Sequence, residues 1–140
     1  MFNTIPAEER PFVFVVEDNS GDEMMTLRSL RGLAKTTEVA RDGSEALDRL
    51  RSLCEGGRVP DVVLLDLKLP LMNGFEVLQA IQEDDQMPEI PVIVLSSSDL
   101  ESDHAKAEEL GVREFVSKPV SYQSYIETVR RAVNEALLTD

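Results

Sequence analysis

The chain has 140 residues, enough for one domain of ordinary size, and its formal net charge of −13 at pH 7 would repel a phosphate backbone, so we expect no direct nucleic-acid binding. No apolar run approaches the roughly 20 residues of a membrane span, and residues 1–10 lack the basic start and apolar stretch of a signal peptide. These features predict a cytoplasmic protein without membrane attachment, and the single cysteine, Cys54, fits a reducing compartment.

Five short segments have the composition of β-strands. Four of them are nearly continuous apolar runs rich in β-branched residues, which is typical of strands buried on both faces of a parallel sheet. These runs cover residues 12–16, 62–65, 92–95 and 112–116, and a weaker extended stretch covers residues 36–40. Each of the five is followed by a segment with a helical pattern.

Apolar residues recur at helical spacing in those following segments. In chain order the predicted helices carry Met24, Leu27, Leu30 and Leu33; Ala46, Leu47, Leu50, Leu53 and Cys54; Phe75, Leu78 and Ile81; Leu100, Ala107 and Leu110; and Tyr122, Ile126, Val129, Val133 and Leu137, widened by Tyr125 and Ala136. The fourth pattern is the weakest and the fifth is the clearest. Ser121 is a suitable N-cap for the last helix, as is Asp42 or Ser44 for the second.

Five strand–helix repeats predict an α/β fold with one parallel sheet and helices on both of its faces. With right-handed crossovers, five strands fit the flavodoxin-like, doubly wound (βα)5 arrangement with strand order 2-1-3-4-5. We expect residues 11–138 to form this domain and residues 1–10 to form an N-terminal tail. The sequence shows no linker to an output domain.

Polar residues stand where the predicted strands end. Glu17 and Asp18 follow the first strand, Asp66 ends the third, three serines from Ser96 follow the fourth, and Lys118 follows the fifth before a proline. In open α/β sheets, binding sites form beyond the carboxyl ends of the strands, so these side chains are expected to share one edge. Each residue alone is ordinary, because carboxylates and serines at strand ends are most often helix caps or turn residues.

The chemistry of this set is that of phosphoryl transfer. Clustered carboxylates repel one another unless a cation lies among them, and Mg²⁺ prefers oxygen ligands of this kind. A carboxylate can attack phosphorus and form an aspartyl-phosphate. Lys118 would offer a compact positive charge, and the Ser96 hydroxyl a hydrogen bond, to oxygens of the phosphoryl group.

Four stretches resemble the receiver domains of response regulators, the phosphoacceptor proteins of two-component systems. They are VFVVEDN from Val13, VVLLDLKLPLMNG from Val62, PVIVLSSS from Pro91 and GVREFVSKP from Gly111. Their order, spacing and strand context all agree with that family over nearly the whole chain. The resemblance implies a CheY-like signalling protein that catalyses only its own phosphorylation and dephosphorylation, and is not otherwise an enzyme.

The same resemblance implies a role for each site residue. Asp66 would be the phosphoacceptor, and Mg²⁺ would be held by Glu17, Asp18, Asp66 and the backbone carbonyl of Lys68. Ser96 and Phe115 would be the switch pair, with Phe115 turning inward as Ser96 moves toward the phosphoryl group. Lys118 would be the family's lysine, with the bond to Pro119 expected to be cis. The Lys68 side chain is either solvated, within reach of the phosphoryl group, or part of a salt bridge at the rim of the site.

Partners are also implied by this resemblance. A sensor histidine kinase would donate the phosphoryl group. The segment from Glu83 to Asp99 and the Pro60–Asp61 entry resemble single-domain regulators paired with bacterial phytochromes, so a bacteriophytochrome is the suggested kinase. With no output domain, we expect the signal to leave through a homodimer formed by the fourth helix, the fifth strand and the fifth helix.

Three alternatives remain open from the sequence. A haloacid-dehalogenase-like phosphatase also uses an aspartate after a strand, but it needs a second acid where Lys68 stands. A flavodoxin-like electron carrier would need a Ser-, Thr- and Gly-rich first loop, whereas this chain has EDNSGD. A receiver that acts without phosphorylation is the third alternative. His104, the only histidine, is interpreted as a plain surface residue, and Cys54 as packing in the second helix.

Overall fold

The parallel sheet predicted from the sequence is present in the structure, a computed structural model that describes residues 10–98 and 100–138. Residues 1–9 of the predicted N-terminal tail lie outside the described residues. The strands are β1 (Phe12–Val16), β2 (Thr36–Ala40), β3 (Val62–Asp66), β4 (Val92–Ser96) and β5 (Glu114–Ser117). The helices are α1 (Ser20–Ser29), α2 (Gly43–Glu55), α3 (Gly74–Glu83), α4 (Glu101–Glu109) and α5 (Tyr122–Leu138).

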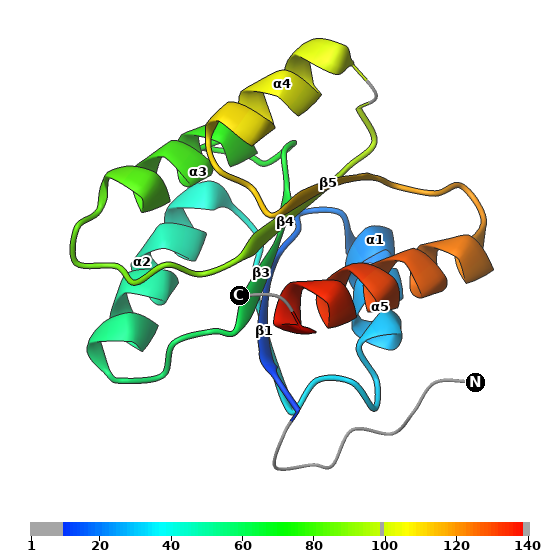
Figure 1. The fold of residues 1–140 in the computed structure, drawn as a ribbon, viewed down its shortest axis with the longest axis horizontal. Helices are drawn as coiled ribbons and strands as arrows, with labels where there is room; N and C mark the ends of the chain where they lie inside the picture. Colours follow the sequence, from blue (N-terminus) through cyan, green and yellow to red (C-terminus); the bar gives the residue numbers. More distant parts are fainter. Residues whose placement is uncertain (1–9, 99, 139–140) are drawn as a thin grey trace.

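Every neighbouring pair of strands is parallel, and the strand order is β2-β1-β3-β4-β5 (Figure 1). The predicted fold class and strand order are therefore confirmed. The boundaries of β1 and β2 agree with the prediction, while β5 begins at Glu114, two residues later than expected. The two preceding residues, Val112 and Arg113, lie between the turn at Leu110–Gly111 and the strand.

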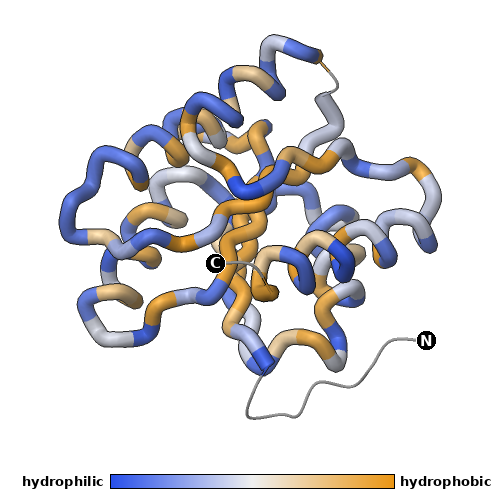
Figure 2. The backbone as a smooth tube through the Cα atoms, in the orientation of Figure 1, coloured by the Kyte–Doolittle hydropathy of each residue, from blue (hydrophilic) through white to orange (hydrophobic). Residues whose placement is uncertain are grey.

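Two apolar cores cover the two faces of the sheet. Alternate residues of each strand point to opposite faces, so Val13 and Val15 pack with α1 and α5, whereas Phe14 and Val16 pack with α2 and α3. Figure 2 shows the hydrophobic residues concentrated along the strands between the helical layers. Because β1, β3 and β4 are buried on both faces, their sequences are continuous apolar runs.

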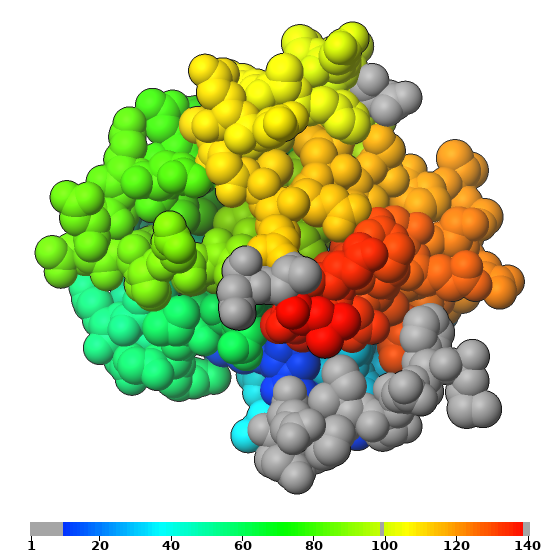
Figure 3. All heavy atoms as spheres, viewed as in Figure 1, coloured from blue at the N-terminus to red at the C-terminus, as the bar shows by residue number. Residues whose placement is uncertain are grey.

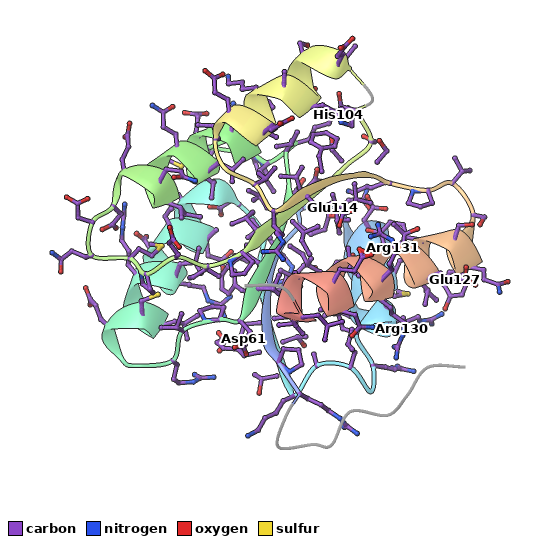
Figure 4. All side chains as sticks on the ribbon, in the orientation of Figure 1. Asp61, His104, Glu114, Glu127, Arg130 and Arg131 are labelled. Atoms are coloured by element: carbon purple, nitrogen blue, oxygen red, sulfur yellow. The ribbon has the colours of Figure 1, made fainter. Side chains whose placement is uncertain are left out.

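Each of the two outer strands carries a glutamate that forms an ion pair with at least one arginine. On β2, the Glu38 carboxylate pairs with Arg49 and, at 3.3 Å, with Arg58. On β5, Glu114 pairs with Arg131 of α5 at 2.8 Å, and Figure 4 shows these two side chains facing each other. Both edges of the sheet therefore present paired charges.

Side-chain caps fix the start of most helices. Asn19, Asp42 and Asn73 cap α1, α2 and α3, and Asn73 forms a full capping box with Glu76. Ser121 accepts a hydrogen bond from the backbone N–H of Ser124, which confirms its predicted role as N-cap. Among the described residues, no helix is long and apolar enough to cross a membrane.

Candidate functional site

Four strands bring polar side chains to one edge of the sheet. Glu17 follows β1, Asp66 and Ser96 are the last residues of β3 and β4, and Lys118 follows β5. Because the strands are parallel, these positions share the carboxyl edge of the sheet. Glu17 and Asp66 are only 2% and 7% exposed, and Ser96 is fully buried. Ionisable groups so far from water need partners.

The Lys118 ammonium is the centre of the cluster. Its Nζ donates to Glu17 Oε1 at 3.0 Å, to Asp66 Oδ2 at 3.1 Å and to Asp22 Oδ2 at 2.7 Å. The lysine side chain is itself only 8% exposed. The single Lys118 ammonium thus pairs with three carboxylates: one follows β1, one ends β3 and one lies in α1.

Asp22 is a member of this cluster that the sequence analysis missed. It lies in the first turn of α1, where an acidic residue is unremarkable because it favours the helix dipole. Its backbone N–H donates to the side chain of Asn19, the helix N-cap. Only the ion pair seen in the structure shows that its carboxylate reaches Lys118, and no local motif signals that contact.

The electrostatics of the cluster show an excess of negative charge. Burial raises the pKa of Glu17 to about 8, and the hydrogen bond and charge of Asp66 add to this rise against the lowering effect of Lys118. Burial alone would lower the pKa of Lys118, but the hydrogen bond to Asp22 and the charges of Asp66 and Glu17 raise it well above its usual range. The lysine therefore stays protonated, and one positive charge does not satisfy all the carboxylates.

The predicted metal ligands are only partly brought together. Asp18 is exposed, and none of the ion pairs of the Lys118 cluster involves it. Within residues 10–98 and 100–138, no three His, Cys, Asp or Glu side chains are grouped so as to hold a metal ion. The donor chemistry nevertheless fits a hard divalent cation, because Glu17, Asp18 and Asp66 offer carboxylate oxygens and Lys68 adds a backbone carbonyl.

The loop after β3 holds Asp66 in place. Asp66 Oδ1 accepts the backbone N–H of Lys68 at 3.2 Å, and the Lys68 side chain is exposed. The N–H of Gly74 donates to the carbonyl of Leu67 at 2.9 Å. A Cβ at Gly74 would lie 2.6 Å from the Asp66 carbonyl oxygen, so only glycine lets α3 start this close to the strand end.

Ser96 and Lys118 are linked through the backbone. The N–H of Lys118 donates to the Ser96 carbonyl at 2.8 Å, which ties the end of β5 to the end of β4. The Ser96 hydroxyl oxygen accepts the N–H of Ser98 at 3.0 Å. Its hydroxyl hydrogen is thus left for another acceptor at this buried edge.

The expectation of a cis bond between Lys118 and Pro119 is wrong. All peptide bonds among the described residues are trans. The trans form is the preferred state of a bond to proline, and the Lys118 side chain reaches Glu17, Asp22 and Asp66 from it. A cis bond is therefore not required to aim the lysine at the cluster.

Phe115 and His104 form a stacked pair. Phe115 lies on β5 opposite Val94, on the same face of the sheet as Ser96, and is partly buried in the core under α4. The imidazole of His104 from α4 stacks on its ring, with centroids 3.8 Å apart and planes at 30°. Figure 4 shows His104 on the side of α4 that faces β5. The interpretation of His104 as a plain surface residue is therefore corrected.

Cys54, in contrast, packs partly against the core from α2, as expected.

The fold and this cluster define a doubly wound α/β domain with a buried aspartate and a lysine at the carboxyl edge of its sheet. The family described as "Response regulator receiver domain" matches residues 13–130. That range covers most of the chain, so the protein belongs to the response regulator receiver family. The match gives no support to a haloacid-dehalogenase-like phosphatase or a flavodoxin-like carrier.

Three solved structures show the same relationship. The phosphorylated cyanobacterial phytochrome response regulator RcpA is 32% identical, with a TM-score of 0.83, and the match covers 93% of this chain and 95% of RcpA. The Mn²⁺-bound response regulator Rcp1 is 28% identical, with a TM-score of 0.81 and coverages of 93% and 96%. The bacteriophytochrome response regulator AtBRR is 40% identical, with a TM-score of 0.72 and coverages of 94% and 96%.

Proposed function

We propose that this receiver domain accepts a phosphoryl group on Asp66 from a sensor histidine kinase and signals through its α4–β5–α5 surface. The observation that carries the proposal is the position of Asp66. Its carboxylate is buried at the end of β3, lies 3.1 Å from the Lys118 ammonium, and is held by the N–H of Lys68. A carboxylate fixed beside a cation that can bind phosphoryl oxygens is suited to attack phosphorus.

The transfer is a displacement at phosphorus. An oxygen of Asp66 forms a bond to the phosphorus of a phosphohistidine, and the bond from phosphorus to the imidazole nitrogen breaks. Lys118 then pairs with an oxygen of the transferred group, and the buried Ser96 hydroxyl donates to another. Mg²⁺ held by Glu17, Asp18, Asp66 and the Lys68 carbonyl would neutralise negative charge on that group, and the Mn²⁺-bound relative Rcp1 supports this assignment.

Exposed apolar side chains surround this edge of the sheet and offer a docking surface for the kinase. Met24 is 55% exposed in α1, Leu71 is 86% exposed in the loop after Asp66, and Val120 is 102% exposed shortly after Lys118. We propose these three side chains as contacts for the kinase. The similarity to RcpA and AtBRR supports a phytochrome kinase as the donor. Phosphotransfer from a panel of kinases that shows no preference for a phytochrome kinase would remove that assignment.

The output surface is proposed from the segments that flank β5. In Figure 3, α4, β5 and α5, coloured from yellow to red, form one continuous face. Leu137 of α5 is 37% exposed, which leaves apolar area for a second copy of the chain. Light scattering with and without beryllofluoride tests the homodimer, and a monomer in both states rejects it.

The decisive experiment is the intact mass of the protein after incubation with acetyl phosphate and Mg²⁺. The wild type should gain one phosphoryl mass, and Asp66→Asn should gain none because the nucleophilic oxygen is replaced by an amide nitrogen. Asp85→Asn is the matched control, since Asp85 is an exposed aspartate far along the chain from the cluster. No gain in the wild type, with histidine-kinase donors also inactive, would favour a receiver that acts without phosphorylation.

A further inference from the structure

Asp22 differs from the other two carboxylates that contact Lys118. In the proposed function, Glu17 is also a metal ligand and Asp66 is also the phosphoacceptor. Asp22 has neither role, yet its Oδ2 lies closest to the lysine Nζ, at 2.7 Å against 3.0 Å and 3.1 Å. The Lys118–Asp22 pair is thus the one ion pair of the cluster that phosphorylation does not have to break.

The helix that carries Asp22 is firmly attached to the helix that follows Lys118. Thr26 of α1 and Tyr125 of α5 share a buried hydrogen bond of 2.9 Å between their hydroxyls. Arg28 of α1 donates to the hydroxyl of Tyr122 at 3.1 Å. Asn19 caps α1 by accepting the backbone N–H of Asp22 itself. The backbone of Asp22 and the start of α5 are therefore held together by packed elements on one face of the sheet, with the Asp22 side chain within reach of Lys118.

The ammonium has to change partners during the proposed reaction. A phosphoryl group on Asp66 takes up the oxygen that Lys118 now contacts, and a cation on Glu17 takes up another. Between losing these two carboxylates and pairing with a phosphoryl oxygen, the lysine side chain could turn toward water, because its four-carbon stem is flexible. A charge-assisted hydrogen bond to a carboxylate that stays in place prevents this.

We propose that Asp22 is a positioning residue for phosphorylation, which holds the Lys118 ammonium beside Asp66 before and after the phosphoryl group arrives. This inference rests on the proposed function of Asp66. Asp22 acts only through Lys118 and does not touch the reacting atoms. The carboxylate also leaves Glu17 less dependent on the lysine, which frees Glu17 oxygens for a divalent cation.

The test compares initial rates of phosphorylation by acetyl phosphate at saturating Mg²⁺. Asp22→Asn leaves only a neutral amide oxygen to accept from Lys118, so the hydrogen bond loses the negative charge of its acceptor and the reaction should slow roughly tenfold. Asp22→Glu should recover part of this loss because it restores the charge. Glu23→Gln is the matched control: it removes the same charge from the same turn of α1, but its carboxylate pairs with Arg41 at 2.8 Å. Its rate should equal that of the wild type.

A double-mutant cycle separates positioning from a general effect of charge or folding. In a Lys118→Ala background, which is slow in its own right, Asp22→Asn should cause no further loss. Melting temperatures of all variants are measured alongside, and rates are compared per folded protein. An Asp22→Asn rate equal to that of the wild type overturns the inference, as does an equal loss with and without Lys118. In both cases phosphorylation of the wild type on Asp66 still stands, and its absence would instead remove the proposed function itself.

Discussion

The two helices beside β5 are held to the domain in different ways. α5 buries five side chains against the sheet and α1, which are Tyr125, Val129, Ala132, Val133 and Ala136. α4 buries only Ala107, and its N-cap residue Leu100 makes no side-chain capping bond. Two ring contacts also attach α4: His104 stacks on Phe115, and the Lys106 ammonium lies over the ring of Phe75. An element with so few buried contacts opens at little free-energy cost, so α4 is the part that we expect to move on phosphorylation.

The largest expected difference between the helices is in stability. Val133→Ala in α5 removes two buried methyl groups, so we expect the free energy of unfolding to fall by about 2 kcal/mol. Ala107→Gly in α4 should cost only about 1 kcal/mol, mostly through helix propensity. Chemical denaturation of the two variants measures both values. Equal losses would show that α4 is as firmly anchored as α5.

The hydrogen bond between Tyr125 and Thr26 provides a smaller test of the α5 anchor. Tyr125→Phe keeps the ring but leaves the buried Thr26 hydroxyl without this partner, so we expect a loss of about 1 kcal/mol in unfolding free energy. Tyr122→Phe is a useful control, because Tyr122 is half exposed and bonds only to the exposed Arg28. If both substitutions have the same effect, burial of the hydroxyl pair contributes nothing.

The smallest expected effect on stability concerns His104, but it bears directly on the proposed switch. His104→Ala should lower the unfolding free energy by only about 0.5 kcal/mol, the lower end for an aromatic pair. The substitution removes stabilisation only from the state in which Phe115 stacks on His104, and the proposed active state, with Phe115 turned inward, does not lose it. Beryllofluoride, which mimics the phosphoryl group, should therefore bind roughly twofold more tightly. A titration followed by intrinsic fluorescence or calorimetry measures this. Lys106→Ala, on the same helix but over Phe75, should leave the binding unchanged.

Periodicity and composition were enough to predict the sheet. Strands buried on both faces have continuous apolar sequences, and that signal survives without any tertiary information. The same reasoning was less accurate for helix faces, because Leu100 and Tyr122 match the helical spacing yet are 63% and 49% exposed. Spacing alone does not tell which edge of a wide apolar stripe meets the core.

The carboxyl edge of the sheet was predicted because topology alone places Glu17, Asp66 and Lys118 there. Asp22 was not predicted, since it lies in a helix rather than at a strand end, and its contact with Lys118 depends on the packing of α1 against α5. The stacking of His104 on Phe115 was missed for a related reason: it depends on side-chain orientation across two elements. The peptide bond before Pro119 was inferred from family resemblance alone, and that inference was wrong.

The paired glutamates on the outer strands have a consequence for how copies of the chain can associate. An unpaired strand edge is a template on which another chain can add a strand, and charged residues there discourage such growth. On β2, Glu38 and its two arginines place charges at the strand edge, and on β5 Glu114 and Arg131 do the same. A second copy would therefore have to join through side chains packed face to face. A sheet that continues from one molecule into the next is therefore disfavoured. Ordered fibres, which grow by extending such a sheet, are disfavoured for the same reason.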